Sequence, residues 1–152
     1  MSPNRIGAGV RTGLVAAAAT AGAIVGFGWR HDTAARPFEI AGRYLLAPLT
    51  ALRAAPSPGT AVTVGIVLHV TTMVLLGVCF TIVAASLRGV RLVAAALLFA
   101  VAAWALVLLV VPSPLRAVAS YTSSVAQAVF VNLLLALSLV SGMRIALLDS
   151  HT

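Results

Sequence analysis

The sequence predicts an all-α integral membrane protein with four transmembrane helices in a single domain, residues 1–152. Hydrophobic residues make up 61% of the chain and charged residues only 9%, whereas soluble domains are about 25% charged. Four stretches without Asp, Glu, Lys or Arg are long enough to cross roughly 30 Å of hydrocarbon as helices. They cover residues 12–29, 60–87, 92–111 and 117–143. Lipid offers no partner to free backbone groups, and no alternating segments indicate a barrel, so the spans are expected to be helices.

The first span carries small residues at four-residue spacing, namely Ala18, Gly22 and Gly26. Such rows let two helix backbones approach closely, which is how apolar helices gain packing energy in lipid. The row therefore predicts a packing face, directed either at another helix of this chain or at another protein. The apolar run of about 18 residues is longer than the core of a signal peptide, so we expect this span to be retained.

Residues 36–53, between the first two spans, separate into an apolar and a polar face at helical spacing. The apolar positions are Phe38, Ala41, Leu45, Leu49 and Leu52, and the polar positions are Arg36, Glu39, Arg43, Thr50 and Arg53. Two interpretations fit this pattern: an amphipathic helix in the membrane interface, or a loop packed across the mouth of the bundle. Pro48 is expected to kink or end such a helix.

Four spans place both termini on one side of the membrane, together with the turn at 88–91. The ten basic residues are all Arg, and they divide evenly between the two sides, so the positive-inside rule does not fix the orientation. The free α-amino group and the double-Arg turn favour cytoplasmic termini in the inner membrane.

The Arg residues stand singly at the ends of the spans. A net charge of +7 would suggest nucleic acid as the partner of a soluble protein, but this distribution favours membrane lipids and excludes a nucleic-acid interface. Arg side chains at such positions extend to lipid phosphates. The residues expected to contact headgroups are Arg30, Arg88, Arg91, Arg116 and Arg144.

Groups able to carry out chemistry are few and far apart. His31, His69 and His151 lie at three different levels, so one chain does not assemble a metal site from them. No carboxylate lies inside a span for acid–base work. We therefore expect no enzymatic activity and no cofactor. A haem hypothesis, with His69 as one ligand and the second supplied by another subunit, ranks third among the functions considered.

His69 lies nine residues into the second span, about 13 Å from the nearer surface. A charged imidazole is costly at that depth, so we expect a neutral ring that is hydrogen-bonded across the bundle. Positions at an equal depth are Gln127 in the fourth span and Thr20 in the first. The expected first partner is Gln127, followed by Ser124, Ser123 or Thr20. A bond of this kind would set the register between helices.

The fourth span carries a polar stripe within about 60° of one direction on an α-helix. Its members are Ser120, Ser123, Ser124, Gln127, Ser138 and Ser141. Such a stripe either lines a water path or joins neighbouring helices.

Two short patterns carry a family resemblance. They are His69, Gly77 and Phe80 in the second span, and Trp104 and Pro112 at the end of the third. The first pattern, His-x7-Gly-x2-Phe, resembles the second helix of a group of small four-helix prokaryotic membrane proteins of uncharacterised function. The fourth helix of that group often carries a further histidine followed by glycines, where this chain has Asn132 and Ala136. The resemblance implies the four-helix topology; it does not imply an activity.

Taken together, these features predict a non-catalytic accessory or scaffolding subunit of a larger membrane complex. Its expected partners are lipids and either other membrane subunits or further copies of itself. The alternative is a small oligomeric transporter or channel.

Overall fold

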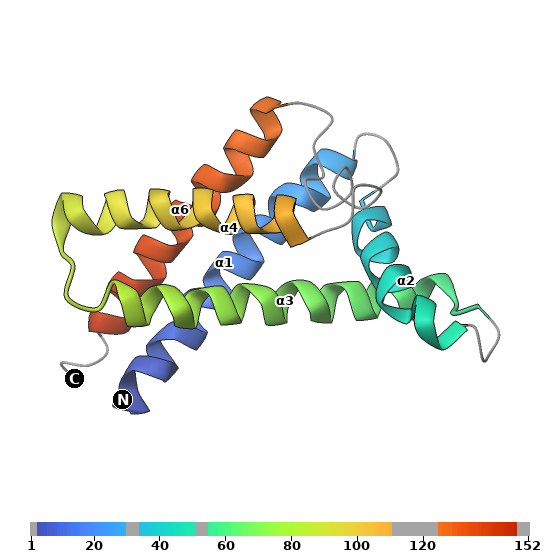
Figure 1. The fold of residues 1–152 in the computed structure, drawn as a ribbon, viewed down its shortest axis with the longest axis horizontal. Coiled ribbons are helices and arrows are strands. Elements are labelled where there is room, and N and C mark those ends of the chain that lie inside the picture. The colour runs from blue at the N-terminus through green and yellow to red at the C-terminus, as the bar shows by residue number, and fades with distance from the viewer. Residues whose placement is uncertain (1–2, 30–33, 51–54, 111–124, 149–152) are drawn as a thin grey trace.

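The computed structural model describes residues 3–29, 34–50, 55–110 and 125–148 and shows an all-α protein, with no strand in those residues (Figure 1). Its helices are α1 (Pro3–Trp29), α2 (Arg36–Thr50), α3 (Pro58–Val83), α4 (Gly89–Val110) and α6 (Val125–Leu148). All but α2 are long and apolar enough to cross a membrane. The predicted fold class, an all-α multi-pass membrane protein, is therefore confirmed.

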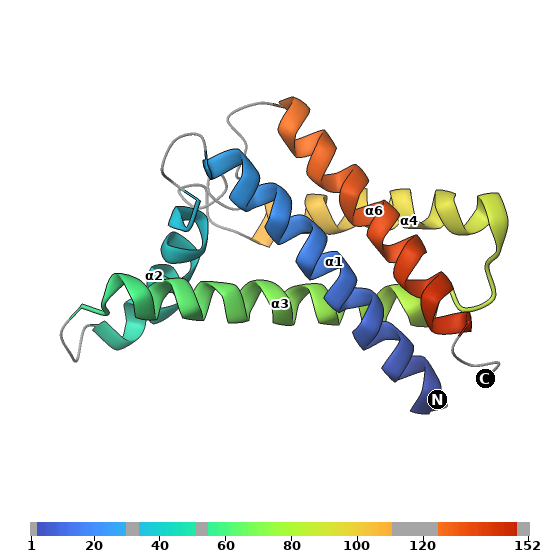
Figure 2. The same ribbon diagram turned by 180° about the vertical axis from the view of Figure 1, so that it is seen from behind.

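The four long helices form two layers that cross each other. In one layer α1 and α6 lie side by side and run in opposite directions (Figures 1 and 2). In the other layer α3 crosses α1, and α4 crosses α6. Although a short turn joins α3 to α4, these two helices touch each other very little. The second layer is therefore held in place mainly by the contacts of α3 with α1 and of α4 with α6.

Local signals in the sequence set the limits of α3. The hydroxyl of Ser57 accepts a hydrogen bond from the backbone N–H of Thr60 at 3.2 Å, and Pro58 takes the first turn, where its missing N–H costs nothing. The helix ends at Val83, four residues before the predicted limit, and Gly89 supplies a left-handed φ of 55° as α4 begins.

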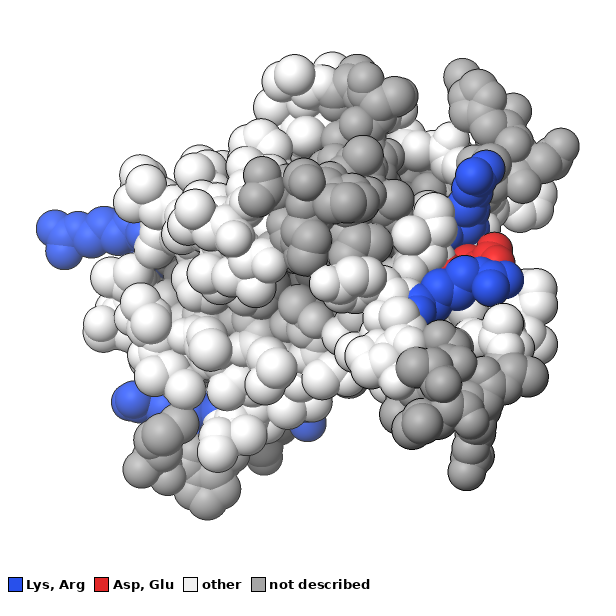
Figure 3. Space-filling model, turned by 45° about the vertical axis from the view of Figure 1, so that its right-hand side comes forward, with Lys and Arg blue, Asp and Glu red and all other residues white. Residues whose placement is uncertain are grey.

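The two termini and the α3–α4 turn lie at one end of the molecule, and α2 lies at the other (Figure 1). On the face seen in Figure 3, basic side chains gather at the ends, and the described residues between them are uncharged. Arg88, Arg91 and Arg144 are exposed. The guanidinium of Arg88 donates to the carbonyl oxygens of Ala85 at 3.1 Å and Leu87 at 2.8 Å. Arg30 and Arg116 lie outside the described residues, and contact with headgroups stays a prediction.

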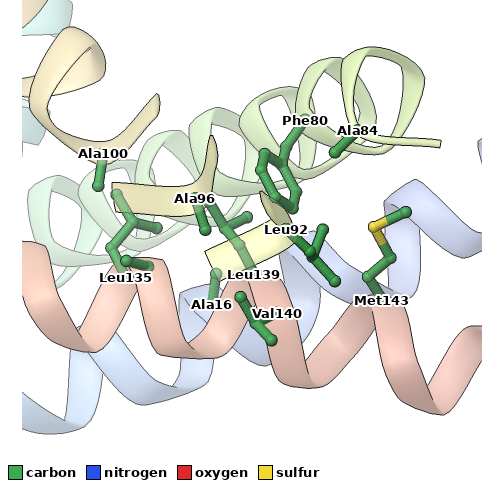
Figure 4. Packing of buried hydrophobic residues seen from close by; sticks show 11 residues of the cluster. Ala16, Phe80, Ala84, Leu92, Ala96, Ala100, Leu135, Leu139, Val140 and Met143 are labelled. Carbon is green, nitrogen blue, oxygen red and sulfur yellow. The ribbon is translucent and has the colours of Figure 1, made fainter. Parts of the chain in front are cut away.

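The core forms where all four long helices meet (Figure 4). Ala96 and Ala100 on α4 are fully buried, and their small side chains leave room for Leu135 and Leu139 of α6. From α3, Phe80 enters this cluster with 1% of its surface exposed and meets the ring of Phe99 edge-on, at a centroid distance of 5.4 Å. Close packing of this kind stabilises helices in lipid, where burial from water contributes nothing.

Away from the core, the spans turn large apolar side chains outward. Helix α4 is the extreme case, because Val90 is 83% exposed and Leu109 80% exposed. Exposed apolar surface on this scale marks a surface that is covered by lipid or by another protein.

The segment predicted at 36–53 is the helix α2, which crosses the beginning of α3 steeply (Figures 1 and 2). Phe38 is buried, whereas Leu45, on the same predicted stripe, is exposed. One part of the stripe therefore packs inside the protein, and another part faces its surroundings. Pro48 does not end the helix at once, because α2 continues to Thr50. Location of α2 in the membrane interface stays a prediction. Positions 51–53 lie outside the described residues.

Candidate functional site

His69 lies on α3 where this helix meets both α1 and α2. Its Nε2 atom is 3.1 Å from the hydroxyl of Thr20 and 3.3 Å from the carbonyl oxygen of Ala17, both on α1. The ring of Phe38, on α2, meets the imidazole edge to face, with centroids 5.7 Å apart and planes at 81°. One side chain therefore joins three helices.

The hydrogen bonds around Thr20 fix the tautomer of this imidazole. The Thr20 hydroxyl donates its single proton to the carbonyl oxygen of Ala16 at 2.7 Å, so towards His69 it acts as an acceptor. The carbonyl oxygen of Ala17 also only accepts. Both contacts therefore require a proton on Nε2 of His69, which in a neutral ring leaves Nδ1 as an acceptor.

The hydrogen bonds of His69 correct the expected order of partners. The first choice, Gln127, does not bond to His69, because α3 packs extensively on α1 and barely touches α6. Depth along the membrane had placed Thr20 and Gln127 at the same level and said nothing of which helix is the neighbour. Thr20, which is 1% exposed, takes that position. Ser123 and Ser124 lie outside the described residues.

A glycine contact brings α1 and α3 close enough for these hydrogen bonds. A Cβ atom added to Gly77 would lie 2.6 Å from Cα of Gly13 and 2.6 Å from the carbonyl oxygen of Gly9. Real Cβ atoms almost never approach another heavy atom so closely. The backbones therefore touch at this crossing, and only glycine fits.

The contact of α1 with α6 follows the same principle. A Cβ atom on Gly142 would lie 2.7 Å from Cα of Thr12, a residue whose surface is fully buried. The Thr12 hydroxyl donates to the carbonyl oxygen of Ala8 at 2.9 Å, within its own helix. It therefore needs no hydrogen-bond acceptor on α6. Helix α1 thus uses one face for both of its neighbours.

The predicted small-residue row on α1 lies on the other side of the helix. Ala18, Gly22 and Gly26 are exposed, and no atom of the described residues lies within 4 Å of a Cβ built on Gly22 or Gly26. Ala18 is about 180° from Gly9 at 100° per residue, so the two cannot share a face. No described helix of this chain therefore packs on Gly22 or Gly26. Contact with another protein stays a prediction.

The signal for the true contact face was present in the resemblance pattern. His69, Gly77 and Phe80 fall within about 80° on α3, and these three residues meet α1 or the core. The pattern therefore has a physical meaning as the packing face of α3. Gly9 and Gly13 face it from α1, but an Ala- and Gly-rich span offers several such rows and gives no means of choosing between them.

Residues with reactive side chains do not gather elsewhere in the described part of the chain, where no group of three His, Cys, Asp or Glu side chains could hold a metal ion. Cys79 is exposed on α3. The amide of Asn132 and the hydroxyl of Ser138 each donate to a carbonyl oxygen four residues earlier in α6. His31 and His151 lie outside the described residues.

Comparison with protein-family models, curated proteins and solved structures finds no match for this chain. The resemblance to the four-helix family therefore stays a prediction. What the site itself offers is an imidazole whose Nε2 atom is engaged in joining α3 to α1.

Proposed function

We propose that this chain is a non-catalytic accessory or scaffolding subunit of a larger membrane complex, in the inner membrane with its termini in the cytoplasm. The observation that carries the proposal is the outward row of Ala18, Gly22 and Gly26 on α1. Helix α1 fills one face with its own neighbours and leaves a second flat face at membrane depth. A flat face of small residues favours close approach by a helix of another subunit.

The site around His69 supports the same function. An imidazole that serves catalysis needs a group to act on, whereas Nε2 of His69 is engaged with Thr20 and Ala17 of its own chain. Its hydrogen bonds, and its edge-on contact with Phe38, serve the packing of α1, α2 and α3. Lipids contacting the exposed Arg side chains at the helix ends complete the expected partners.

Purification in a gentle detergent, followed by mass measurement of the intact assembly, tests this proposal. We expect an assembly that contains this chain and at least one other membrane protein. A homo-oligomer alone would contradict the proposal and favour the alternative of a small oligomeric transporter or channel. Recovery of a monomer alone would count against both. A Soret band in the same sample would favour the haem hypothesis in their place.

A matched pair of variants tests whether the outward row is the docking face. Gly22→Ile places a branched side chain in the row, and we expect it to release the partner. Gly7→Ile is the control, because Gly7 is also exposed with no atom within 4 Å of its Cβ, and it lies about 22 Å away along α1. If both variants retained the partner equally, the row of Ala18, Gly22 and Gly26 would not be the docking face.

A further inference from the structure

A cavity of about 140 Å³ lies between α4 and α6, separate from the His69 site and from the outward row of α1. Its walls are almost wholly apolar, and Ala100, Val101, Trp104 and Val129 are among the residues that form them. The one amide in the lining is that of Asn132. Asn132 is twelve residues from Arg144, or about 18 Å along α6, which places the cavity within the hydrocarbon layer.

The amide of Asn132 has hydrogen-bonding capacity that the described residues do not use. One of its two N–H groups donates to the carbonyl oxygen of Ala128 at 2.9 Å. The second N–H and the amide oxygen have no hydrogen bond to the described part of the chain. Ser138, six residues further along α6, donates its only hydroxyl proton to the carbonyl oxygen of Leu134. Its donor capacity is therefore used. An amide group that lacks hydrogen-bond partners is costly in hydrocarbon, so a polar partner for Asn132 is favourable.

The size and lining of the cavity narrow the class of occupant. The cavity is open on one side. An engineered closed apolar cavity of about 150 Å³ takes up benzene, so this one has room for one six-membered ring. The polar groups of the lining side chains are the amide of Asn132 and the indole N–H of Trp104, so most of the wall offers water no hydrogen bond. An acyl chain fits the volume but leaves the amide of Asn132 unsatisfied.

We propose that this cavity binds a lipid-soluble molecule through a six-membered ring that carries a hydroxyl or carbonyl oxygen, of the phenol or quinone type. The ring lies against Trp104 and the apolar wall, and its oxygen is hydrogen-bonded by Asn132. The proposal is independent of the scaffolding function, because it concerns α4 and α6 and not the outward row of α1.

Trp104 serves as the reporter of binding. The chain has two Trp residues, and Trp29→Phe, at a position that is 74% exposed, leaves Trp104 as the only one. This full-length variant in lipid nanodiscs is titrated with 4-bromophenol or with bromobenzene, since bromine quenches indole fluorescence at short range. We expect saturable quenching by both, with binding of the phenol about fivefold tighter at equal mole fraction in the membrane, as one added hydrogen bond implies.

Two further variants separate the cavity from the surrounding lipid. Asn132→Leu keeps the apolar wall and should remove the difference between the two bromo compounds. Val101 lines the cavity and is 59% exposed, so Val101→Phe should fill the cavity and abolish saturable quenching. Val90→Phe makes the same change elsewhere on α4 and should leave saturable quenching unchanged. Helicity measured by circular dichroism shows that each variant is folded.

Quenching that rises linearly with mole fraction and is unchanged by Val101→Phe would overturn the proposal, because the cavity would then hold no ligand. Equal binding of 4-bromophenol and bromobenzene before Asn132 is changed would overturn it as well. That result would identify the cavity as an apolar groove for acyl chains.

Discussion

Replacement of Gly77 by alanine is the sharpest test of the crossing between α1 and α3. The added Cβ atom would lie 2.6 Å from Cα of Gly13, whereas ordinary contacts of a Cβ begin at 3.4 Å. Its other close neighbours, on Gly9 and Gly13, are also backbone atoms, so no side chain can turn aside. The nearest of these atoms is the backbone nitrogen of Gly13, so the two helices must separate by about 1 Å at this point.

A separation of that size has a calculable cost. A radial gap of 0.5 to 1 Å forfeits about a quarter to a half of the dispersion attraction of each contact, and overpacking in well-packed cores costs about 1–3 kcal/mol. The separation also lengthens the hydrogen bond that His69 makes with Thr20. His69 lies about two helical turns from Gly77 on the same face of α3. We expect Gly77→Ala to lower the free energy of unfolding by about 1–3 kcal/mol.

Unfolding in mixed micelles of increasing SDS content, followed by circular dichroism, measures this change. Gly22→Ala is the matched control on α1, because no atom lies within 4 Å of its Cβ and the higher helix propensity of alanine predicts a neutral or slightly stabilising effect. If Gly77→Ala proved as harmless as Gly22→Ala, the close approach of α1 and α3 would be refuted.

Two further predictions concern the polar contact and α2. In a double-mutant cycle, His69→Ala and Thr20→Ala should be non-additive by about 0.6 kcal/mol and by no more than about 2 kcal/mol, and full additivity would show that the two side chains do not interact. Spin labels placed singly along α2 should alternate with helical period between lipid and water; a uniform aqueous signal along the helix would contradict its predicted position at the membrane surface.

The sequence was sufficient to predict the spans because their signal is local. A run of apolar residues longer than the hydrocarbon is thick leaves little choice of structure, so α3 and α4 lie close to their expected limits. The helical period over residues 36–53 likewise predicted α2 as one of two alternatives. Each of these features depends on residues a few positions apart.

Helix pairing could not be predicted, because it depends on residues far apart in the chain. Thr20 and Gln127 are predicted at the same depth, and depth alone does not say that α3 packs on α1. The small residues of α1 form rows on two opposite sides, and only the glycines of the partner helices, Gly77 and Gly142, decide which side is buried. The approximate extent of a long apolar helix is therefore readable from one sequence, whereas the side of the helix that meets a neighbour is not.

Cysteine labelling of the membrane topology tests the four-span account most directly. Cys79 is exposed on α3 and is first replaced by alanine to give a background without cysteine. Single cysteines at Arg5, Arg88, Arg144 and Arg43 are then treated in sealed vesicles with a maleimide that does not cross membranes. We expect Arg5→Cys, Arg88→Cys and Arg144→Cys to react from one and the same side and Arg43→Cys from the opposite side. Labelling of any two of the first three from opposite sides, or of Arg43→Cys from the same side as the others, would contradict the account.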